Sequence, residues 1–354
     1  MRLIGTSVSW YFGLTSHRFA AITYGRPLGI NDEDCNVTMP ADVHECPYFK
    51  SGSTGGSSVC FSAYQRELNK LYMIASPMIK TIFGAHSMGS MQQATGNLYI
   101  IKNITEKLWN WRQCLPHHLM LDLDHDTDLN VSATLRVHRL QALALQLTFD
   151  NLLIILHRPF LAHQIDILSR SYSGQNQART YSPRHASSPT YSSASCADLY
   201  DGSQLNSQSP SSEQWWNAAM RTSRVTALPH LAQLATDSHL VAFLAINLFN
   251  AAIVMVVIAL SDPLSDRAQE AKRTITRIFR LQELLGKRSM LSMQSSVVLR
   301  KVVHMLLRRE AEAMLAPVTS LQTISADNSN EPSASSTPGL ISVEDTLRLP
   351  FDMP

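Results

Sequence analysis

An acidic stretch with one histidine is the most obvious candidate for metal chemistry in this sequence. Aspartates alternate with other residues at Asp122, Asp124, Asp126 and Asp128, and His125 lies between them. This spacing is that of a calcium-binding loop, which also needs glycine at its sixth position and glutamate at its twelfth. Counted from Asp122 or from Asp124, neither position holds the required residue. We therefore interpret the stretch as a solvated loop whose last aspartates favour the N-terminus of the following helix.

A second acidic run consists of Asp32, Glu33 and Asp34. Neighbouring carboxylates can serve as a general acid and base, but no histidine or lysine adjoins these three. Arg26, which precedes Pro27 in a turn-like sequence, can reach them and fix the turn through a charge-assisted pair. A structural role is the favoured interpretation, and direct binding of an effector by Arg26 is the alternative.

The histidines do not form a catalytic or metal-binding pattern. His117 and His118 are adjacent, while Pro159 interrupts the interval between His157 and His163, so the latter pair does not share one helix face. The sequence contains no zinc-protease, nucleophile-elbow, Walker-type or dinucleotide-binding motif. We expect that this chain has no catalytic residues and is not an enzyme.

The cysteines also argue against a local metal site. Five are scattered along the chain, and no two have the C-x-x-C spacing of a zinc ligand pair. The sequence predicts reduced thiols in an intracellular protein and no metal or cofactor held by this chain.

Composition sets the broad class of the protein and its division into regions. Of 354 residues, 45% are hydrophobic and 16% charged, and the formal net charge is +2. This charge excludes a protein that holds nucleic acid mainly through a massed basic surface. The chain divides into four regions, 1–168, 169–212, 213–316 and 317–354. The second and fourth are rich in serine and proline, so we expect a disordered linker and a disordered tail around two helical blocks.

Helical periodicity dominates both apolar blocks. Apolar residues recur at intervals of three to five within 133–157, 61–73 and 98–111, which is the spacing of one helix face. Pro159 is expected to end the first of these helices, and Arg158 could satisfy its last carbonyl groups. Because strand patterns are few, the sequence predicts an all-α, multi-helix fold.

Residues 240–260 form a stretch of 21 residues without a charge. Its length suits a transmembrane helix, which makes a membrane-anchored protein the alternative function. Two asparagines within the stretch and the lack of an aromatic belt favour a fully buried core helix instead.

Basic residues become frequent after Pro263 and alternate with apolar ones. We interpret them as the solvated face of core-facing helices, and an anionic surface or a partner is the alternative. Near the C-terminus, residues 341–352 mix acids with apolar anchors and are a weak candidate for an activation segment. An ordinary disordered terminus is the favoured interpretation.

Three segments, in chain order, carry a family resemblance. In the first segment, Trp10-Tyr11 precedes Gly25-Arg26-Pro27 and the acidic residues 32–34. The second segment contains Trp109, Trp111 and Leu115-Pro116. The third is the sequence L-H-R-P-F, which begins at Leu156. Together they resemble the fungal-specific transcription factor domain, the regulatory region that follows the zinc-cluster DNA-binding domain in fungal activators and repressors. The motif residues given a structural or regulatory role by this resemblance are Gly25, Arg26, Pro27, Asp32, Asp34, Trp109, Pro116, His157, Arg158 and Pro159.

The resemblance implies transcription regulation in the nucleus. It implies partners among regulatory proteins or the transcription machinery, a small-molecule effector held in an apolar pocket between helices, a homodimer, and no membrane. Zinc and DNA contact are expected only through the family's upstream domain, which this sequence does not contain. We accordingly expect a regulatory domain that is truncated at its N-terminus, with residues 1–168 as its first part and 213–316 as its C-terminal helices.

Overall fold

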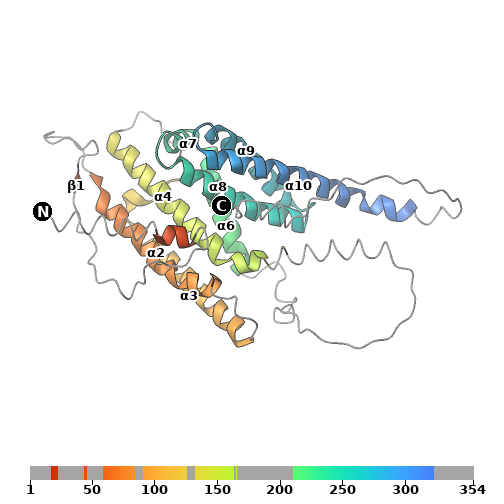
Figure 1. Cartoon of the computed structure of the whole chain (residues 1–354), viewed down its shortest axis with the longest axis horizontal. Coiled ribbons are helices and arrows are strands. Elements are labelled where there is room, and N and C mark those ends of the chain that lie inside the picture. Colours follow the sequence, from red (N-terminus) through yellow and green to blue (C-terminus); the bar gives the residue numbers. More distant parts are fainter. Residues whose placement is uncertain are drawn as a thin grey trace.

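A computed structural model describes residues 17–22, 44–45, 59–83, 91–125, 132–162, 165 and 210–322 of the protein. Within these ranges the chain is a bundle of helices, which confirms the predicted all-α class (Figure 1). The β structure in this part is one antiparallel pair of two-residue strands, β1 (His44–Glu45) and β2 (Val59–Cys60). So short a pair adds no layer to the fold.

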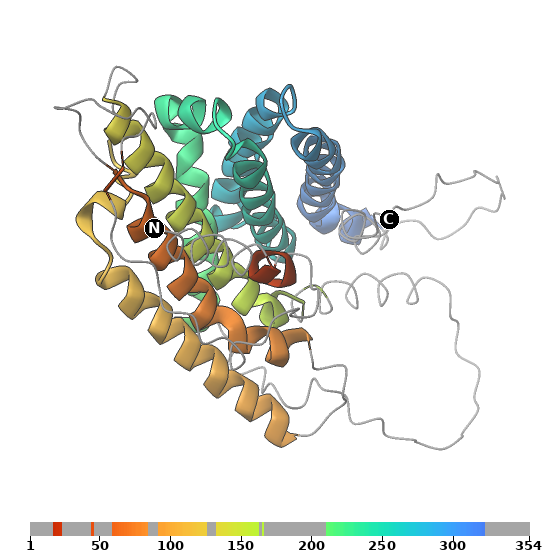
Figure 2. The ribbon, with the colours of Figure 1, turned by 60° about the vertical axis from the view of Figure 1, so that its left-hand side comes forward.

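The N-terminal block consists of α2 (Phe61–Phe83), α3 (Met91–Gln113), the short 3-10 helix η2 (His117–Leu119) and α4 (Ala133–Leu156). Helices α2 and α3 pack against each other, and both contact α4. Figure 2 shows these helices grouped on one side of the molecule.

Helix α4 begins where the sequence predicts. The Oγ atom of Ser132 accepts a hydrogen bond from the backbone N–H of Leu135 at 3.3 Å and so caps the first turn. Every residue from 141 to 157 is buried, which identifies α4 as a central helix of the core. The helix ends at Leu156, but residues 158–162 are helical again. Pro159 therefore lies in the first turn of a new helical segment, where proline is tolerated.

Two helices also extend through prolines, past the ranges in which the sequence pattern indicated helix. Helix α2 continues from 73 through Pro77 to Phe83, and α10 (Met290–Gln322) continues from 316 through Pro317. An interior proline removes one helical hydrogen bond at a cost of about 3 kcal/mol. In α2 the packing against α3 and α4 offsets this cost, and in α10 the proline lies near the end of the helix.

The C-terminal block contains α6 (Pro210–Arg224), η4 (Val225–Ala227), α7 (Pro229–Thr236), α8 (Val241–Ser261) and α9 (Asp266–Leu285), followed by α10. Helix α6 packs against both α4 and α8, so it joins the two blocks. Helices α8, α9 and α10 pack against one another on the other side of the bundle (Figures 1 and 2).

The apolar stretch predicted at 240–260 is helix α8. By length and composition, both α8 and α4 could span a membrane. However, α8 contacts α4, α6, α9 and α10, and most of its residues are buried among them. The helix thus has the surroundings of a core helix, which does not favour the membrane-anchored alternative.

Buried and partly buried polar side chains connect the central helices. The Nδ2 group of Asn250 in α8 donates to Oδ1 of Asn151 in α4 at 2.9 Å. The Nε2 group of Gln282 in α9 donates to the carbonyl oxygen of Ala245 in α8 at 2.6 Å. The Ser292 hydroxyl of α10 donates to the carbonyl oxygen of Gln282 at 2.9 Å and also contacts its side-chain oxygen. These bonds fix the register of four helices.

The predicted linker and tail fall mostly outside the described residues. Of residues 169–212, the structure describes only 210–212, which begin α6. Of residues 317–354, it describes only 317–322, which end α10.

Candidate functional site: a buried charge cluster between α3, α4 and α6

Helices α3 and α4 run antiparallel, and this brings two of the sequence motifs together. Thr105 of α3 lies beside His157 at the end of α4, whereas Trp109 lies beside Phe149, two turns earlier in α4. Trp109 and His157 thus lie about two turns apart along one line of contact between α3 and α4, which we call the seam, although 47 residues separate them in the sequence.

Asp150, which is fully buried in this seam, is the centre of a charged group. Its Oδ1 atom accepts hydrogen bonds from Nε and one terminal nitrogen of Arg221 in α6, at 2.9 and 2.7 Å. Its Oδ2 atom accepts a bond of 2.6 Å from Gln146, whose side-chain oxygen in turn accepts one from Arg112 of α3. We call Asp150, Arg221, Gln146 and Arg112 the buried charge cluster.

Aromatic rings enclose the buried charge cluster. The ring of Phe149 lies 5.1 Å from the Arg112 guanidinium and 5.7 Å from that of Arg221. Trp109 packs edge-on against Phe149 and also lies 5.3 Å from the Arg221 guanidinium. Its indole N–H donates to the side-chain oxygen of Gln214 at 3.2 Å. The rings offer their π faces to the two cations.

Burial and ion pairing have opposite effects on the pKa of Asp150. Burial raises the pKa of this carboxyl from 3.8 to about 6, and the Arg221 guanidinium opposes the rise. At neutral pH the group is therefore ionised and forms a buried ion pair. Burial likewise lowers the pKa of Arg112, and the charge of Asp150 acts against that change.

A second polar contact attaches α2 to the same seam. The indole N–H of Trp111 donates to Oε2 of Glu67 in α2 at 2.9 Å, and Lys70 pairs with the other oxygen at 2.7 Å. Trp111 also stacks on Phe149 with a centroid separation of 6.0 Å. The two tryptophans of α3 thus contact one ring of α4 while reaching polar partners in α2 and α6.

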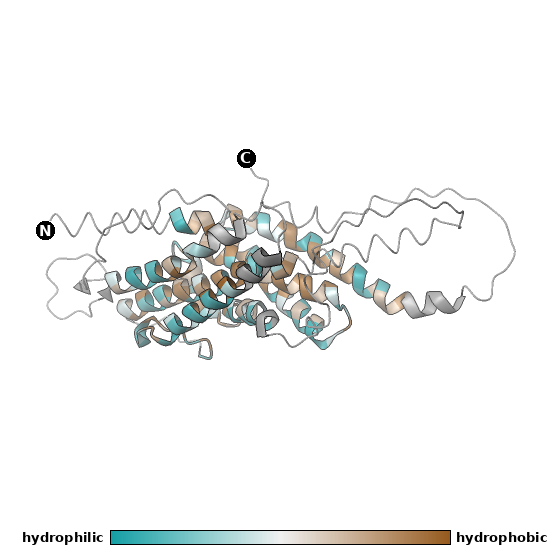
Figure 3. Cartoon of the chain, turned by 90° about the horizontal axis from the view of Figure 1, so that it is seen from below, coloured by the Kyte–Doolittle hydropathy of each residue, from teal (hydrophilic) through white to brown (hydrophobic). Residues whose placement is uncertain are grey.

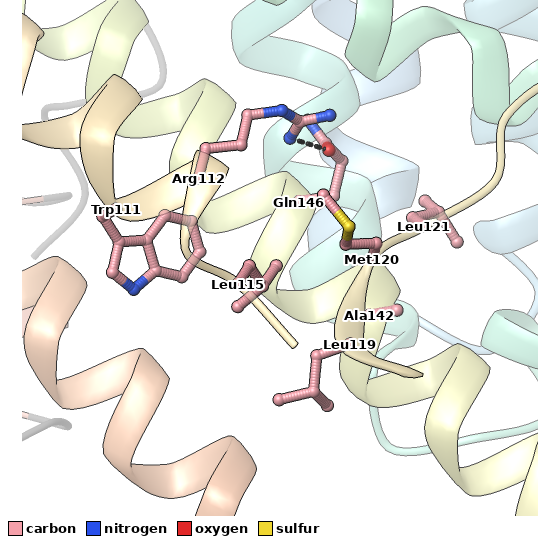
Figure 4. Close-up of a pocket in the computed structure, with 8 residues that line it drawn as sticks. All are labelled: Trp111, Arg112, Leu115, Leu119, Met120, Leu121, Ala142 and Gln146. Atoms are coloured by element: carbon pink, nitrogen blue, oxygen red, sulfur yellow. Dashed lines mark hydrogen bonds between the residues drawn. The ribbon is translucent and has the colours of Figure 1, made fainter. Parts of the chain in front are cut away.

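A cavity beside the buried charge cluster has a volume of about 10 Å³, which is room for roughly one water molecule. Its lining includes Arg112, Gln146 and Met120, which converge on it in Figure 4. Pockets for small-molecule ligands measure roughly 300–1,000 Å³. The expected effector therefore has no room at this place in the structure.

His157 is buried at the end of α4. Its Nε2 atom lies 3.4 Å from Oγ1 of Thr105, and that hydroxyl already donates to the carbonyl oxygen of Ile101 at 2.8 Å. The hydroxyl oxygen therefore accepts from His157, which places the proton on Nε2. Burial lowers the pKa of His157 from 6.5 to about 4, so the ring is neutral at physiological pH.

The other motif residues divide between described and undescribed parts of the chain. Pro116 precedes η2 in the turn after α3, and Arg158 and Pro159 are exposed directly after His157. The five remaining residues lie outside the described residues, so the predicted ion pair of Arg26 stays a prediction: these are Gly25, Arg26, Pro27, Asp32 and Asp34.

The acidic stretch near 122 has the character of a solvated loop in its described part. Asp122, Asp124 and His125 are exposed, and Oδ1 of Asp122 accepts the backbone N–H of Asp124 at 2.8 Å. Among the described residues, no three His, Cys, Asp or Glu side chains gather as metal ligands.

The sequence reasoning missed the members of the buried charge cluster. One signal was available: Asp150 is an acidic residue within an otherwise apolar helical repeat, and a buried acid requires a cation or a hydrogen-bond donor. The sequence could not identify which arginine supplies that partner, because Arg221 lies 71 positions away, beyond the linker.

Comparison with known proteins gives two relatives. Over 156 residues, or 44% of this chain, the sequence is 26% identical to an uncharacterized transcriptional regulatory protein of Schizosaccharomyces pombe. Over 150 residues, or 42% of the chain, it is 27% identical to the acetamidase regulatory protein of Aspergillus fumigatus. The chain is similar to fungal transcriptional regulators.

The similarity covers only part of these relatives. The matched stretch spans 17% of the length of the first protein and 16% of the second. No family model matches the chain, and no solved structure matches it.

Proposed function

We propose that this chain is the regulatory region of a fungal zinc-cluster transcription factor. The observation that carries the proposal is the similarity to two fungal regulators over about 150 residues. In this role the chain acts in the nucleus through contacts with regulatory proteins or the transcription machinery, and it does so without catalysis. DNA contact and zinc belong to a separate zinc-cluster domain of the full protein.

The geometry of the site supports a structural role for the motif residues. Trp109 and His157 are directed into the seam between α3 and α4, and the buried charge cluster ties this seam to α6. Side chains that pack between helices in this way position the helices rather than meet a substrate. Regulation is therefore expected to act through the outer faces of the bundle, or through an effector bound away from the cavity beside the cluster.

Chromatin immunoprecipitation of the endogenous, epitope-tagged protein tests this proposal. We expect enrichment at discrete sites upstream of genes, with several-fold changes in the transcripts of those genes when the gene is deleted. The untagged strain is the control. A well-expressed protein that gives only background signal on chromatin would contradict the proposal.

A further inference from the structure

Helix α10 carries apolar residues on two opposite faces. One face packs into the core and includes Leu299, Val302 and Leu306, which are buried. The opposite face is exposed to solvent. The exposed fractions along it are 69% for Met290, 44% for Met293, 53% for Val297, 55% for Leu307 and 62% for Met314.

The exposed residues follow a seven-residue repeat. Positions 290, 297, 304 and 311 alternate with 293, 300, 307 and 314, and all eight are exposed. This is the a and d spacing by which a helix packs against a second apolar segment. We call this set the outer stripe: Met290, Met293, Val297, Arg300, His304, Leu307, Ala311 and Met314. Single exposed apolar residues are ordinary, but apolar residues that recur on one face, here on both sides of Arg300 and His304, are typical of an interaction surface.

The outer stripe lies on a helix that extends past its neighbours. Helices α9 and α10 run antiparallel, since Gln282 contacts Ser292 while Lys272 and Gln269 contact Glu310. Residue 310 is thus level with the first turns of α9, and α10 continues to Gln322 beyond that point. Figure 1 shows this end of α10 projecting from the bundle, and in Figure 3 apolar and polar residues alternate along the part of α10 that precedes this end.

The middle of the outer stripe is basic. Arg300 belongs to the stripe, and Lys301 and Arg308 flank it. Between residues 266 and 315 the sequence has 11 Lys and Arg against 5 Asp and Glu, a net charge of +6. Arg300 pairs with Glu283 at 2.9 Å and Arg308 with Glu312 at 3.0 Å, but all four side chains are well exposed and such pairs are weak. An occupant that combines acids with apolar side chains fits this surface.

A second copy of the chain offers the basic middle of the outer stripe no acidic partner. In the antiparallel register that places Val297 against Leu307 of the other copy, the methionines also meet apolar residues, but Arg300 meets His304. The outer stripe contains no Asp or Glu, so no carboxylate would pair with Arg300 across such an interface. An acidic segment supplies that partner, which favours it over a second copy.

The same chain contains a segment of the complementary chemistry. Residues 341–352 contain Ile341, Val343, Leu347, Leu349 and Phe351 together with Glu344, Asp345 and Asp352. With Arg348 as its one basic residue, the segment has a net charge of −2. It lies outside the described residues.

The length of the intervening sequence permits the segment to reach the outer stripe. Eighteen residues, 323–340, separate the end of α10 from the segment. A flexible connection of that length has a root-mean-square span of about 24 Å. The distance from Gln322 back along the helix to Leu307 is about 22 Å at 1.5 Å per residue. A tethered segment at matched distance has a high effective concentration at its site.

We propose that residues 341–352 bind the outer stripe of α10 in the same molecule. Their apolar side chains cover Val297, Leu307 and the methionines, and Glu344 and Asp345 pair with Arg300 and Lys301. The contact itself does not depend on the proposed function.

Hydrogen exchange of the full chain, followed by mass spectrometry, tests the contact. We expect amides in 341–352 to exchange about tenfold more slowly than an unstructured peptide of the same sequence. In the variant Val297→Asp/Leu307→Asp this protection is lost. The control Tyr99→Asp/Leu264→Asp adds two carboxylates at exposed apolar positions elsewhere and retains it.

A charge exchange gives a second test that does not depend on apolar substitutions. The variant Glu344→Lys/Asp345→Lys is expected to lose protection, and adding Arg300→Glu/Lys301→Glu is expected to restore it. Light scattering on the same samples should report a monomer. Exchange of 341–352 at the rate of the free peptide would overturn the proposal, and so would protection that appears only in a concentration-dependent dimer.

Discussion

At the scale of single residues, Asp150 and Arg221 form a buried ion pair, and losing either partner destabilises the folded state. Removing one partner of a buried pair leaves the other uncompensated and typically costs about 3–5 kcal/mol. We predict a loss of this order in the free energy of unfolding for Arg221→Met, measured by urea denaturation. Arg224→Met, three residues away and exposed, is the matched control and should change stability by less than about 1 kcal/mol.

The pH dependence of Arg221→Met provides a check on the cause of its instability. Arg221 opposes the rise in the pKa of Asp150, so its removal raises that pKa further. A carboxyl with a raised pKa in the folded state gains stability as the pH falls through that pKa. The deficit of Arg221→Met should therefore shrink as the pH falls toward about 6 and stay constant below that pH, where Asp150 is protonated in both proteins. Equal stability of Arg221→Met and Arg224→Met would contradict the assignment of a buried ion pair.

As the pH falls, His157 lowers the stability of the folded protein, whereas Asp150 raises it. The unfolded chain binds a proton on this residue below pH 6.5, whereas the folded chain does not until about pH 4. The stability contributed by the neutral ring is thus complete above pH 6.5 and falls by up to about 3 kcal/mol between pH 6.5 and 4. The variant His157→Gln cannot titrate and should lack this loss.

The measurement for His157 is the difference between wild type and His157→Gln at each pH. The difference removes the contribution of Asp150, which has the opposite sign and is common to both proteins. Parallel stability curves for the two proteins between pH 7 and pH 4 would show that His157 is solvated rather than buried.

At the scale of elements, Gln282 fixes the register of three helices. Its amide donates to Ala245 in α8 and its oxygen atoms receive Ser292 in α10. Substitution with leucine removes the donor to the Ala245 carbonyl, whereas the Ser292 hydroxyl keeps its bond to the backbone carbonyl of residue 282; loss of the buried side-chain bond costs roughly 1–3 kcal/mol. We predict that Gln282→Leu lowers the urea midpoint and speeds hydrogen exchange in α10.

The control for Gln282→Leu is Gln294→Leu, which makes the same change at an exposed position of α10. It should leave both the urea midpoint and the exchange rates within error of wild type. Should both variants behave alike, the buried amide does not determine the packing of α10.

Most helices were predictable from the sequence, and the reason is visible in α4 and α8. Each has an uninterrupted apolar pattern with a clear start, so local information suffices. The ends of α2 and α10 were not predictable, because tertiary packing carries α2 through Pro77 and the position of Pro317 near the helix end makes it tolerable. Proline is a local signal that packing can override.

The candidate site was predictable only in part. Trp109 and His157 were found from their motifs, but their shared seam depends on the antiparallel packing of α3 and α4. The ion pair of Asp150 joins residues on either side of the linker, and no local pattern encodes such a distant pairing. The motifs are therefore recognisable in the sequence, but the contacts that they make are visible only in the structure.

At the scale of the whole molecule, the protein has a well-connected interior and an outer surface available for partners. The buried charge cluster and the bonds of Gln282 and Asn250 join helices from both blocks. Apolar residues also lie on the outside of the bundle, in the outer stripe of α10, where we propose that residues 341–352 bind. This arrangement suits a regulatory domain with a rigid core that is bound at its surface.

A reporter assay tests the central claim, regulatory activity of the helical bundle, most directly. The full chain is fused to a heterologous DNA-binding domain in yeast and transcription from a matched promoter is measured. We predict a several-fold change, abolished by Leu143→Asp in the core and retained by Tyr99→Asp on the surface. Unchanged transcription with the wild-type fusion, at a protein level equal to that of the control, would contradict the claim.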